Sequence, residues 1–279
     1  MRGLPLSRYS VSDLTREVAK EFPRAPSRST VGRILRENNL RPWAVHEWKH
    51  PRDPEFGPKA ARLLDLYHGK WEGEPLGPED VVVSLDEKTC IQAFRRLERT
   101  APPAPGKPMR VQFEYERLGV AIYLAALNLG TGRVYGNLVE ANNKVTFLAF
   151  MEHLMEQEPF RSARRVFLVM DNGSSHDPRT FPAVVTGKWP KVTVAYTPTH
   201  GSWLNPVEQY FGGLQRKALE PNDFPTKEAM LERIREFESL HNRYSRPVRW
   251  NWTREEMLEW LARLEVESGL DLGVAKVTA

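Results

Sequence analysis

The sequence predicts an α/β protein in which helices flank a mixed β-sheet, with a small all-α module in front of it. Three observations support this fold class. Apolar residues at helical spacing occupy much of the first fifty residues. Consecutive strands joined by turns follow, which predicts antiparallel pairing. Strands then alternate with helices, which predicts parallel pairing in the later part of the same sheet.

Two helices are expected in the N-terminal module, over residues 10–22 and 29–38. Ser10 and Asp13 form a capping-box pattern at the start of the first helix, and Pro23 ends it. A helix, a short turn and a second helix with a basic outer face are typical of the helix-turn-helix. Helical hairpins with arginines on the wet side are also common, so this pattern alone leaves a plain solvated surface open.

The second helix of this module has an apolar side and a polar side. Val31, Ile34 and Leu35 are expected to face inward. If the helix enters the major groove of DNA, its outer side would contact bases or phosphates. The residues expected to do so are Arg28, Thr30 and Arg33.

The positive charge of the chain is concentrated at its N-terminus. Residues 1–50 hold ten Lys and Arg against five Asp and Glu, whereas the other 229 residues hold thirty against thirty-one. A basic segment joined to a near-neutral body indicates a module that binds a polyanion. On charge alone, a solvated basic face explains the pattern equally well.

Apolar runs, periodicity and turn residues predict the elements of the remaining chain. Residues 51–79 are expected to form a linker and one helix, 80–250 the main α/β domain, and 251–279 a C-terminal helix and an unstructured tail. Strands are predicted over residues 80–86, 109–116, 120–127, 133–139, 166–170 and 192–196. Helices are predicted over residues 143–157, 178–188, 226–244 and 253–265, and from residue 205 onward.

The composition indicates a reducing compartment. Cys90 is the single cysteine, so an internal disulfide cannot form. The first residues lack the apolar run of a signal peptide, and the longest apolar run, over residues 120–127, is too short to cross a membrane. We therefore expect a cytoplasmic protein without a membrane partner.

Three acidic residues are the candidates for chemistry. Asp86 and Asp171 each end an apolar strand, and Glu208 lies in the first turn of a helix. If the two strands are neighbours, the three carboxylates can converge, and their repulsion would raise their pKa values unless a cation neutralises them. Hard divalent ions such as Mg²⁺ or Mn²⁺ suit this ligand set, and a pair of them supports phosphodiester chemistry.

Each of these acids also has a structural explanation. Asp86 can be a solvated charge at a strand end, and Asp171 before Asn172 and Gly173 can form a turn. Glu208 stands where a capping-box glutamate is common. The histidines lack the spacing of zinc ligands, so we expect no zinc site, and the sequence contains no P-loop or nucleophile elbow.

Four sequence blocks stand out in the main domain, and the last of them is the most specific. They are Leu85–Thr89 with Ile91–Ala93, Glu114–Tyr115 with Arg117–Gly119, Met170–His176, and Thr197–Glu208. Together these blocks resemble the bacterial insertion-sequence DDE transposases of the mariner superfamily, in particular the IS-six-thirty-like branch. The resemblance covers most of residues 81–250.

The resemblance implies a ribonuclease-H-like fold and a catalytic, metal-binding triad of Asp86, Asp171 and Glu208. It implies two Mg²⁺ ions per site, for which Mn²⁺ can substitute. The implied partner is DNA, comprising the terminal inverted repeats of a transposon and a target that contains TA. A homodimer on paired ends and association with the nucleoid are also implied.

The resemblance further implies that four residues near the acidic positions contact DNA. Lys88 lies beside the first acid, and His200, Trp203 and Asn205 precede the third. The last three can equally serve as scaffolding of their loop. Members of this group usually carry two helix-turn-helix units, but only one fits before residue 50, so we expect the first unit to be missing.

The sequence therefore predicts a DNA transposase that hydrolyses phosphodiester bonds at transposon ends and transfers the strands into target DNA. One alternative is a catalytically silent DNA-binding remnant, or a repressor of a full-length transposase. Another is a ribonuclease-H-like endonuclease without strand transfer. The complete triad favours an enzyme, whereas the short N-terminal part favours the silent alternative.

Overall fold

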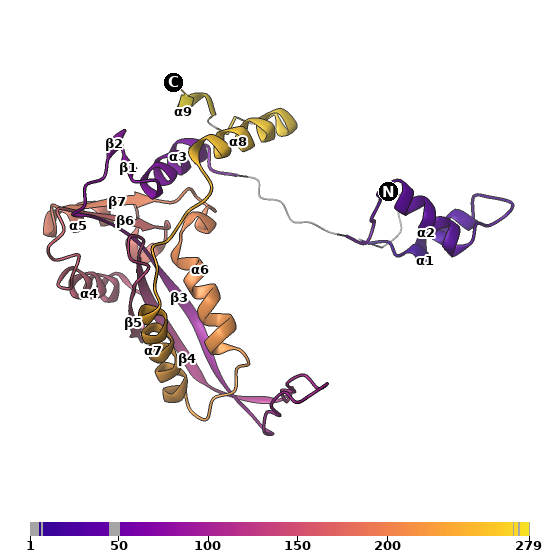
Figure 1. The fold of residues 1–279 in the computed structure, drawn as a ribbon, viewed down its shortest axis with the longest axis horizontal. Coiled ribbons are helices and arrows are strands. Elements are labelled where there is room, and N and C mark those ends of the chain that lie inside the picture. Colours follow the sequence, from indigo (N-terminus) through magenta and orange to yellow (C-terminus); the bar gives the residue numbers. More distant parts are fainter. Residues whose placement is uncertain (1–5, 7, 45–50, 270, 273, 279) are drawn as a thin grey trace. The chain divides into compact units, whose positions relative to one another are not determined.

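The computed structural model describes residues 6, 8–44, 51–269, 271–272 and 274–278. It divides into two compact units, Met1–His50 and Pro51–Ala279; Figure 1 labels α1 and α2 in the first unit and the other elements in the second. Among the helices of these described stretches, none has both the length and the hydropathy needed to cross a bilayer.

The first unit contains α1 (Val11–Ala19) and α2 (Arg28–Glu37). The predicted capping box is present, because Ser10 and Asp13 bond reciprocally to each other's backbone N–H groups at the start of α1. Val31 and Leu35 are buried as expected, but the inward placement of Ile34 is wrong, since that residue is 47% exposed. Two packed helices bury only a narrow stripe of each other, and Ile34 lies outside it.

The second unit is built on a five-stranded sheet with the order β5-β4-β3-β6-β7. β3 pairs with β4, and β4 with β5, in antiparallel fashion, whereas β3–β6 and β6–β7 are parallel. The predicted mixed sheet is therefore confirmed. Its strands are β3 (Asp80–Arg96), β4 (Tyr115–Asn128), β5 (Val134–Val139), β6 (Arg165–Met170) and β7 (Val192–Tyr196).

Two predicted strands differ from the structure. β3 runs ten residues beyond its predicted end at residue 86, because Ile91 and Ala93 continue its buried face after a bulge at Cys90, where φ is +55°. The predicted strand over residues 109–116 is wrong for 109–114, where Arg110 forms only an isolated bridge. Phe113 there is 89% exposed, so this alternating pattern has no buried face to occupy.

Helices cover both faces of the sheet (Figure 1). On one face α4 (Lys144–Met155) and α5 (Phe181–Lys188) enclose an apolar core with β3, β4 and β6. On the other face α6 (Val207–Leu214), its π-helical continuation Gln215–Leu219 and α7 (Lys227–Arg243) pack on β3, β4 and β5.

A third core lies beside β6 and β7. There α3 (Phe56–Tyr67) and α8 (Arg254–Ser268) pack against the sheet. A small hairpin of β1 (Lys70–Trp71) and β2 (Glu74–Pro75) follows α3. The tail after residue 269 was expected to be unstructured, which is wrong, because α9 (Val274–Thr278) contacts α3 and α8.

Asp80 joins the two central parallel strands at their beginning. Its buried side chain at the start of β3 accepts hydrogen bonds from Arg165 at 2.6 Å and Arg164 at 2.8 Å, both at the start of β6, and from the backbone N–H of Gly77 at 2.8 Å. The Arg165 guanidinium above all holds the pKa of Asp80 well below its usual value. This end of the β3–β6 pair is therefore fixed by charge.

We expect Asp80→Asn to lower the melting temperature at pH 7 by roughly 2–6 °C, because the carboxylate bonds are lost. The pKa of Asp80 is lowered on folding, so its stabilisation is complete above pH 4 and is lost as the pH falls further. Thermal unfolding of both proteins between pH 3 and 7 measures this difference. Glu152→Gln, which breaks the exposed Lys188 pair, is the control and should change little.

Candidate active site

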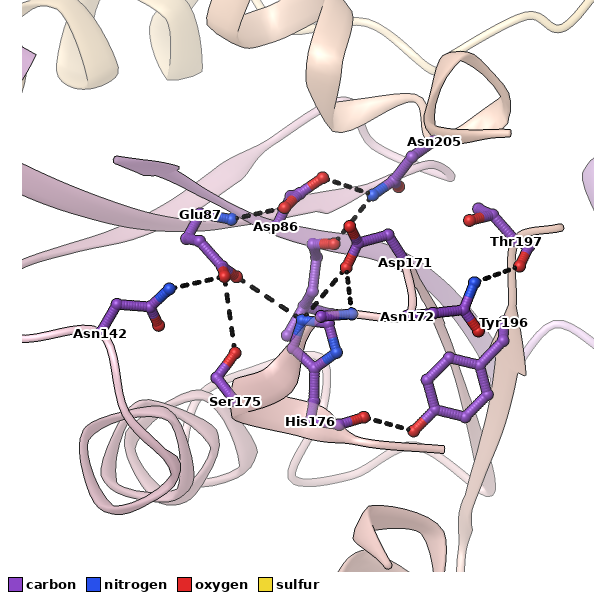
Figure 2. A network of polar contacts seen from close by, with 12 residues as sticks. Asp86, Glu87, Asn142, Asp171, Asn172, Ser175, His176, Tyr196, Thr197 and Asn205 are labelled. Atoms are coloured by element: carbon purple, nitrogen blue, oxygen red, sulfur yellow. Dashed lines mark hydrogen bonds and ion pairs between the residues drawn. The ribbon is translucent and has the colours of Figure 1, made fainter. Parts of the chain in front are cut away.

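Asp86 and Asp171 lie side by side on neighbouring parallel strands. Ser84 of β3 is in register with Val169 of β6, and each aspartate follows two residues later, on the same face. Both carboxylates therefore point toward the side of the sheet that carries α6. Figure 2 shows both side chains close to the point where the parallel pairing of β3 with β6 ends.

Glu208 approaches the two aspartates from the first turn of α6. Burial has the largest effect on the pKa of Glu208, Lys88 opposes it and the negative charge of Asp171 adds to it, so that the pKa is raised. Burial, then Asp171, and further Glu208 and Glu87, raise the pKa of Asp86 to about 7. The three predicted residues thus lie within electrostatic range of one another, although Asp86 and Glu208 are 122 positions apart in sequence (208 − 86).

The donor set suits a hard divalent cation. Asp86 is 8% exposed and surrounded by like charge, which is the situation that a bound cation relieves. Among the described residues, no three His, Cys, Asp or Glu side chains are grouped to hold one ion. Mg²⁺ is commonly held by one or two carboxylates, with water and substrate phosphates completing its shell, so pairs of these acids suffice.

A second polar group lies on the opposite face of β3, below the aspartates (Figure 2). Glu87 accepts a hydrogen bond from Asn142 at 2.7 Å. The buried His176 places Nε2 3.5 Å from Glu87 Oε2 and 3.4 Å from Asp171 Oδ1. His176 therefore connects the strand end of β6 with the residue after Asp86.

Charge pairing governs the protonation of these two residues. Burial tends to lower the pKa of His176, but Glu87, Asp171 and Asp86 together raise it above its usual value. Burial tends to raise the pKa of Glu87, but the 3.5 Å contact with His176 and the hydrogen bond from Asn142 outweigh it and lower the pKa. The pair therefore favours the charged imidazolium and the charged carboxylate.

The loop over residues 197–205 connects β7 to α6 and is held at several points. The carboxylate of Asp53 accepts from the backbone N–H of Thr199 at 2.8 Å, and the Tyr67 hydroxyl donates to the carbonyl of Leu204 at 2.7 Å. Trp203 packs among aromatic rings, and its ring centroid lies 5.4 Å from that of Trp252. These contacts favour scaffolding for Trp203, one of the two roles that the sequence left open.

The other predicted contacts of this region occupy different environments. Asn205 is buried and donates to Asp86 Oδ2 at 3.0 Å, which also favours a scaffolding role over DNA contact. His200 is exposed at the tip of the loop with φ +59°. Lys88 is half-buried on β3 near Glu208. The structure thus leaves His200 and Lys88 accessible to a ligand.

The three residues predicted to read DNA belong to the first unit. Arg28 begins α2 and is exposed, and Arg33 forms an exposed ion pair with Glu37 at 2.9 Å. Thr30 contributes its backbone N–H to the Ser27 cap at 3.1 Å. The acidic residues belong to the second unit.

Sequence reasoning did not identify Ser84, Glu87, His176 and Asp53 as parts of this site. Ser84 had a detectable signal, because it is a polar residue at an inward position of an otherwise apolar strand, two residues before Asp86. Asp53 had none, since its partner, the Thr199 backbone, is 146 positions away.

Solved structures share this fold. The chain is similar to the Mos1 mariner paired end complex with Mn, with a TM-score of 0.55 and 18% identity over 96% of this chain and 79% of that one. It is also similar to a pre-cleavage Mos1 transpososome, with a TM-score of 0.54 and 16% identity over 99% of this chain and 81% of that one. Its TM-score with the Mos1 strand transfer complex is 0.52, with 15% identity over 96% of this chain and 78% of that one. At these identities the likeness shows the fold, and the predicted ribonuclease-H-like fold is confirmed.

A comparison with curated proteins found no match. One family model, described as DDE superfamily endonuclease, matches residues 81–231, which is more than half of the chain. The matched region begins with the strand that carries Asp86, contains Asp171 at the end of β6, and includes all of α6 with Glu208. By this match the chain belongs to the DDE superfamily endonucleases.

Proposed function

We propose that this protein is a DNA transposase that hydrolyses phosphodiester bonds at transposon ends and joins the freed ends to target DNA. The observation that carries this proposal is the placement of Asp86 within β3 beside Asp171 at the end of the adjacent parallel strand β6, with Glu208 in electrostatic range. The fold likeness to Mos1 complexes, one of them a strand transfer complex, supports it.

We propose that the three carboxylates share two divalent ions, Mg²⁺ or Mn²⁺. Asp86 and Asp171 would hold the first ion, and Asp86 and Glu208 the second. Such ions activate a water or a DNA 3′-hydroxyl for attack and stabilise the leaving oxygen. In this arrangement the chain orients the ions by fixing its carboxylates, and Lys88, close to Glu208, is available for a DNA phosphate.

DNA is the proposed substrate and partner, and the first unit is proposed to act as a helix-turn-helix module. The excess of positive charge in residues 1–50 and the exposed arginines of α2 support this assignment. The sequence blocks further support an IS-six-thirty-like element, terminal inverted repeats and TA targets. The matched paired-end complexes of Mos1 support a dimer that holds two ends.

We expect Asp171→Asn to abolish nicking and joining of end-containing DNA with Mg²⁺ or Mn²⁺. Because a ligand would be lost, the rate should fall by more than about 100-fold, the upper range for outer-shell partners. Gel analysis of labelled DNA measures both products. Asp177→Asn, six residues away and paired with Arg179, is the matched control and should cleave normally.

The same assay separates the alternatives. A wild-type protein that binds DNA without cutting would support a silent remnant or repressor and contradict the proposal. Nicking without joined products would support an endonuclease without strand transfer. Cleavage that persists in Asp171→Asn would exclude the proposed site.

Metal binding should depend on pH near neutrality. Folding without metal raises the pKa of Asp86 from 3.8 to about 7. The free energy of unfolding therefore decreases as the pH rises from about 4 to about 7, because Asp86 must be charged in the fold above that range. A divalent ion offsets this loss, so the rise in melting temperature that Mn²⁺ causes should be large at pH 8 and small at pH 6. Thermal unfolding in EDTA and in Mn²⁺ measures it. An increment that is independent of pH, or that persists in Asp86→Asn, would contradict this site.

DNA binding by the full chain should depend on the outer face of α2. Arg28→Ala should weaken binding of end-containing DNA and lower the slope of affinity against salt by about one, because one phosphate contact is lost. Fluorescence anisotropy at several salt concentrations measures both quantities. Arg16→Ala on α1, where Arg16 pairs with Asp13, is the control. Equal losses in the two variants would contradict a role specific to α2.

A further inference from the structure

Ser84 and Asn205 form a buried polar contact between the central strand and the start of α6. Both side chains are almost completely shielded from solvent. Ser84 shares the face of β3 with Asp86, because side chains alternate along a strand. Buried hydroxyl and amide groups destabilise a fold unless hydrogen bonds satisfy them, so their partners indicate why such residues are present.

The hydrogen-bond partners of these two side chains belong both to β3, which carries Asp86, and to α6, which carries Glu208. The Ser84 hydroxyl accepts from the backbone N–H of Val207 at 2.9 Å and donates to Asn205 Oδ1. The Asn205 amide nitrogen donates to the carbonyl of Leu85 at 3.0 Å and to Asp86 Oδ2 at 3.0 Å. Both amide hydrogens and the hydroxyl hydrogen are therefore used.

The same contact determines where α6 begins. Val207 is the first residue of α6, and Pro206 at the cap position forms no side-chain cap, so the Ser84 hydroxyl satisfies a free helix N–H. The backbone N–H of Glu208 donates to the carbonyl of Asn205 at 3.1 Å. Asn205 thus contacts Asp86 through its side chain and Glu208 through its main chain.

The orientation of Asp86 follows from these bonds. Oδ1 accepts from the backbone N–H of Glu87 at 2.8 Å, and Oδ2 accepts from Asn205. An ionised carboxylate has about four acceptor positions, so each oxygen keeps one for another ligand. Rotation of the carboxylate is therefore restricted while its capacity to bind a cation is retained.

We propose that Ser84 and Asn205 are positioning residues that fix Asp86 and Glu208 relative to each other, so that both carboxylates reach the same ion. This inference rests on the proposed metal-dependent function. Outer contacts of this kind orient metal ligands before the metal arrives, and losing them weakens metal binding without removing a ligand. Apolar residues of similar size would pack the same space but would leave Asp86 free to rotate.

The test measures Mn²⁺ binding to the full chain without DNA, by titration calorimetry. Ser84→Ala and Asn205→Ala should each weaken Mn²⁺ binding by roughly 10- to 100-fold. Ser84→Thr keeps the hydroxyl and should recover most of the affinity. Circular dichroism and melting temperature in EDTA show whether each variant folds, and the two alanine variants test the contact independently.

Asn242→Ala is the matched control. Asn242 also joins a helix to a strand through its side-chain amide, accepting from the Val134 N–H at 2.8 Å and donating to the Val134 carbonyl at 2.7 Å. Its loss should lower the melting temperature in EDTA but leave Mn²⁺ affinity unchanged. A purely structural role of Asn205 would give the same result for Asn205→Ala, and this outcome would overturn the inference.

The outcomes also separate this inference from the proposed function. If the wild type binds Mn²⁺ and cleaves DNA while the Ser84 and Asn205 variants bind Mn²⁺ as tightly, the positioning role is wrong and the proposed function stands. If the wild type neither binds Mn²⁺ nor cleaves, the proposed function fails and the inference fails with it.

Discussion

Repulsion between neighbouring carboxylates is the constraint on which the structure of this site depends. Asp86 is buried in the central strand β3, just beyond the point where its parallel pairing with β6 ends and beside Asp171, and its pKa is raised to about 7. Hydrogen-bond donors surround both groups: the Glu87 N–H and the Asn205 amide contact Asp86, and the Gly173 N–H contacts Asp171 at 2.9 Å. The fold accepts this electrostatic cost where a cation would remove it, as is expected of a functional site.

The two faces of β3 contribute differently to the site. The face toward α6 carries Ser84 and Asp86, and its polar groups are connected by hydrogen bonds to the helix that holds Glu208. The opposite face carries Glu87, which pairs with the buried His176. His176 also lies 3.4 Å from Asp171, so the Glu87–His176 pair supports the end of β6 from the face of the sheet opposite α6. Because successive side chains of a strand point to opposite faces of the sheet, β3 places the carboxylate of Asp86 in the site and that of Glu87 on the opposite face.

Elements at both ends of the second unit support the active-site loop. The loop before α6 contacts α3 through Tyr67, and Trp203 packs on Phe56 and on Trp260 of α8. The C-terminal helix α8 therefore belongs to the scaffold of the site, although it lies outside the matched family region. His200 at the exposed tip of this loop keeps a left-handed backbone, a conformation that non-glycine residues rarely adopt without a surrounding constraint.

The sequence by itself determined the class of fold, most element positions and the three acidic candidates, because apolar periodicity, caps and strand ends are local properties. It did not determine the full length of β3, the lack of a strand over residues 109–114 or the exposure of Ile34. These three features depend on which parts of the folded chain pack against each segment. Only the tertiary structure placed Asp86 beside Asp171 and joined Ser84 to Asn205, since such contacts link residues far apart in the chain and follow from strand register and helix packing.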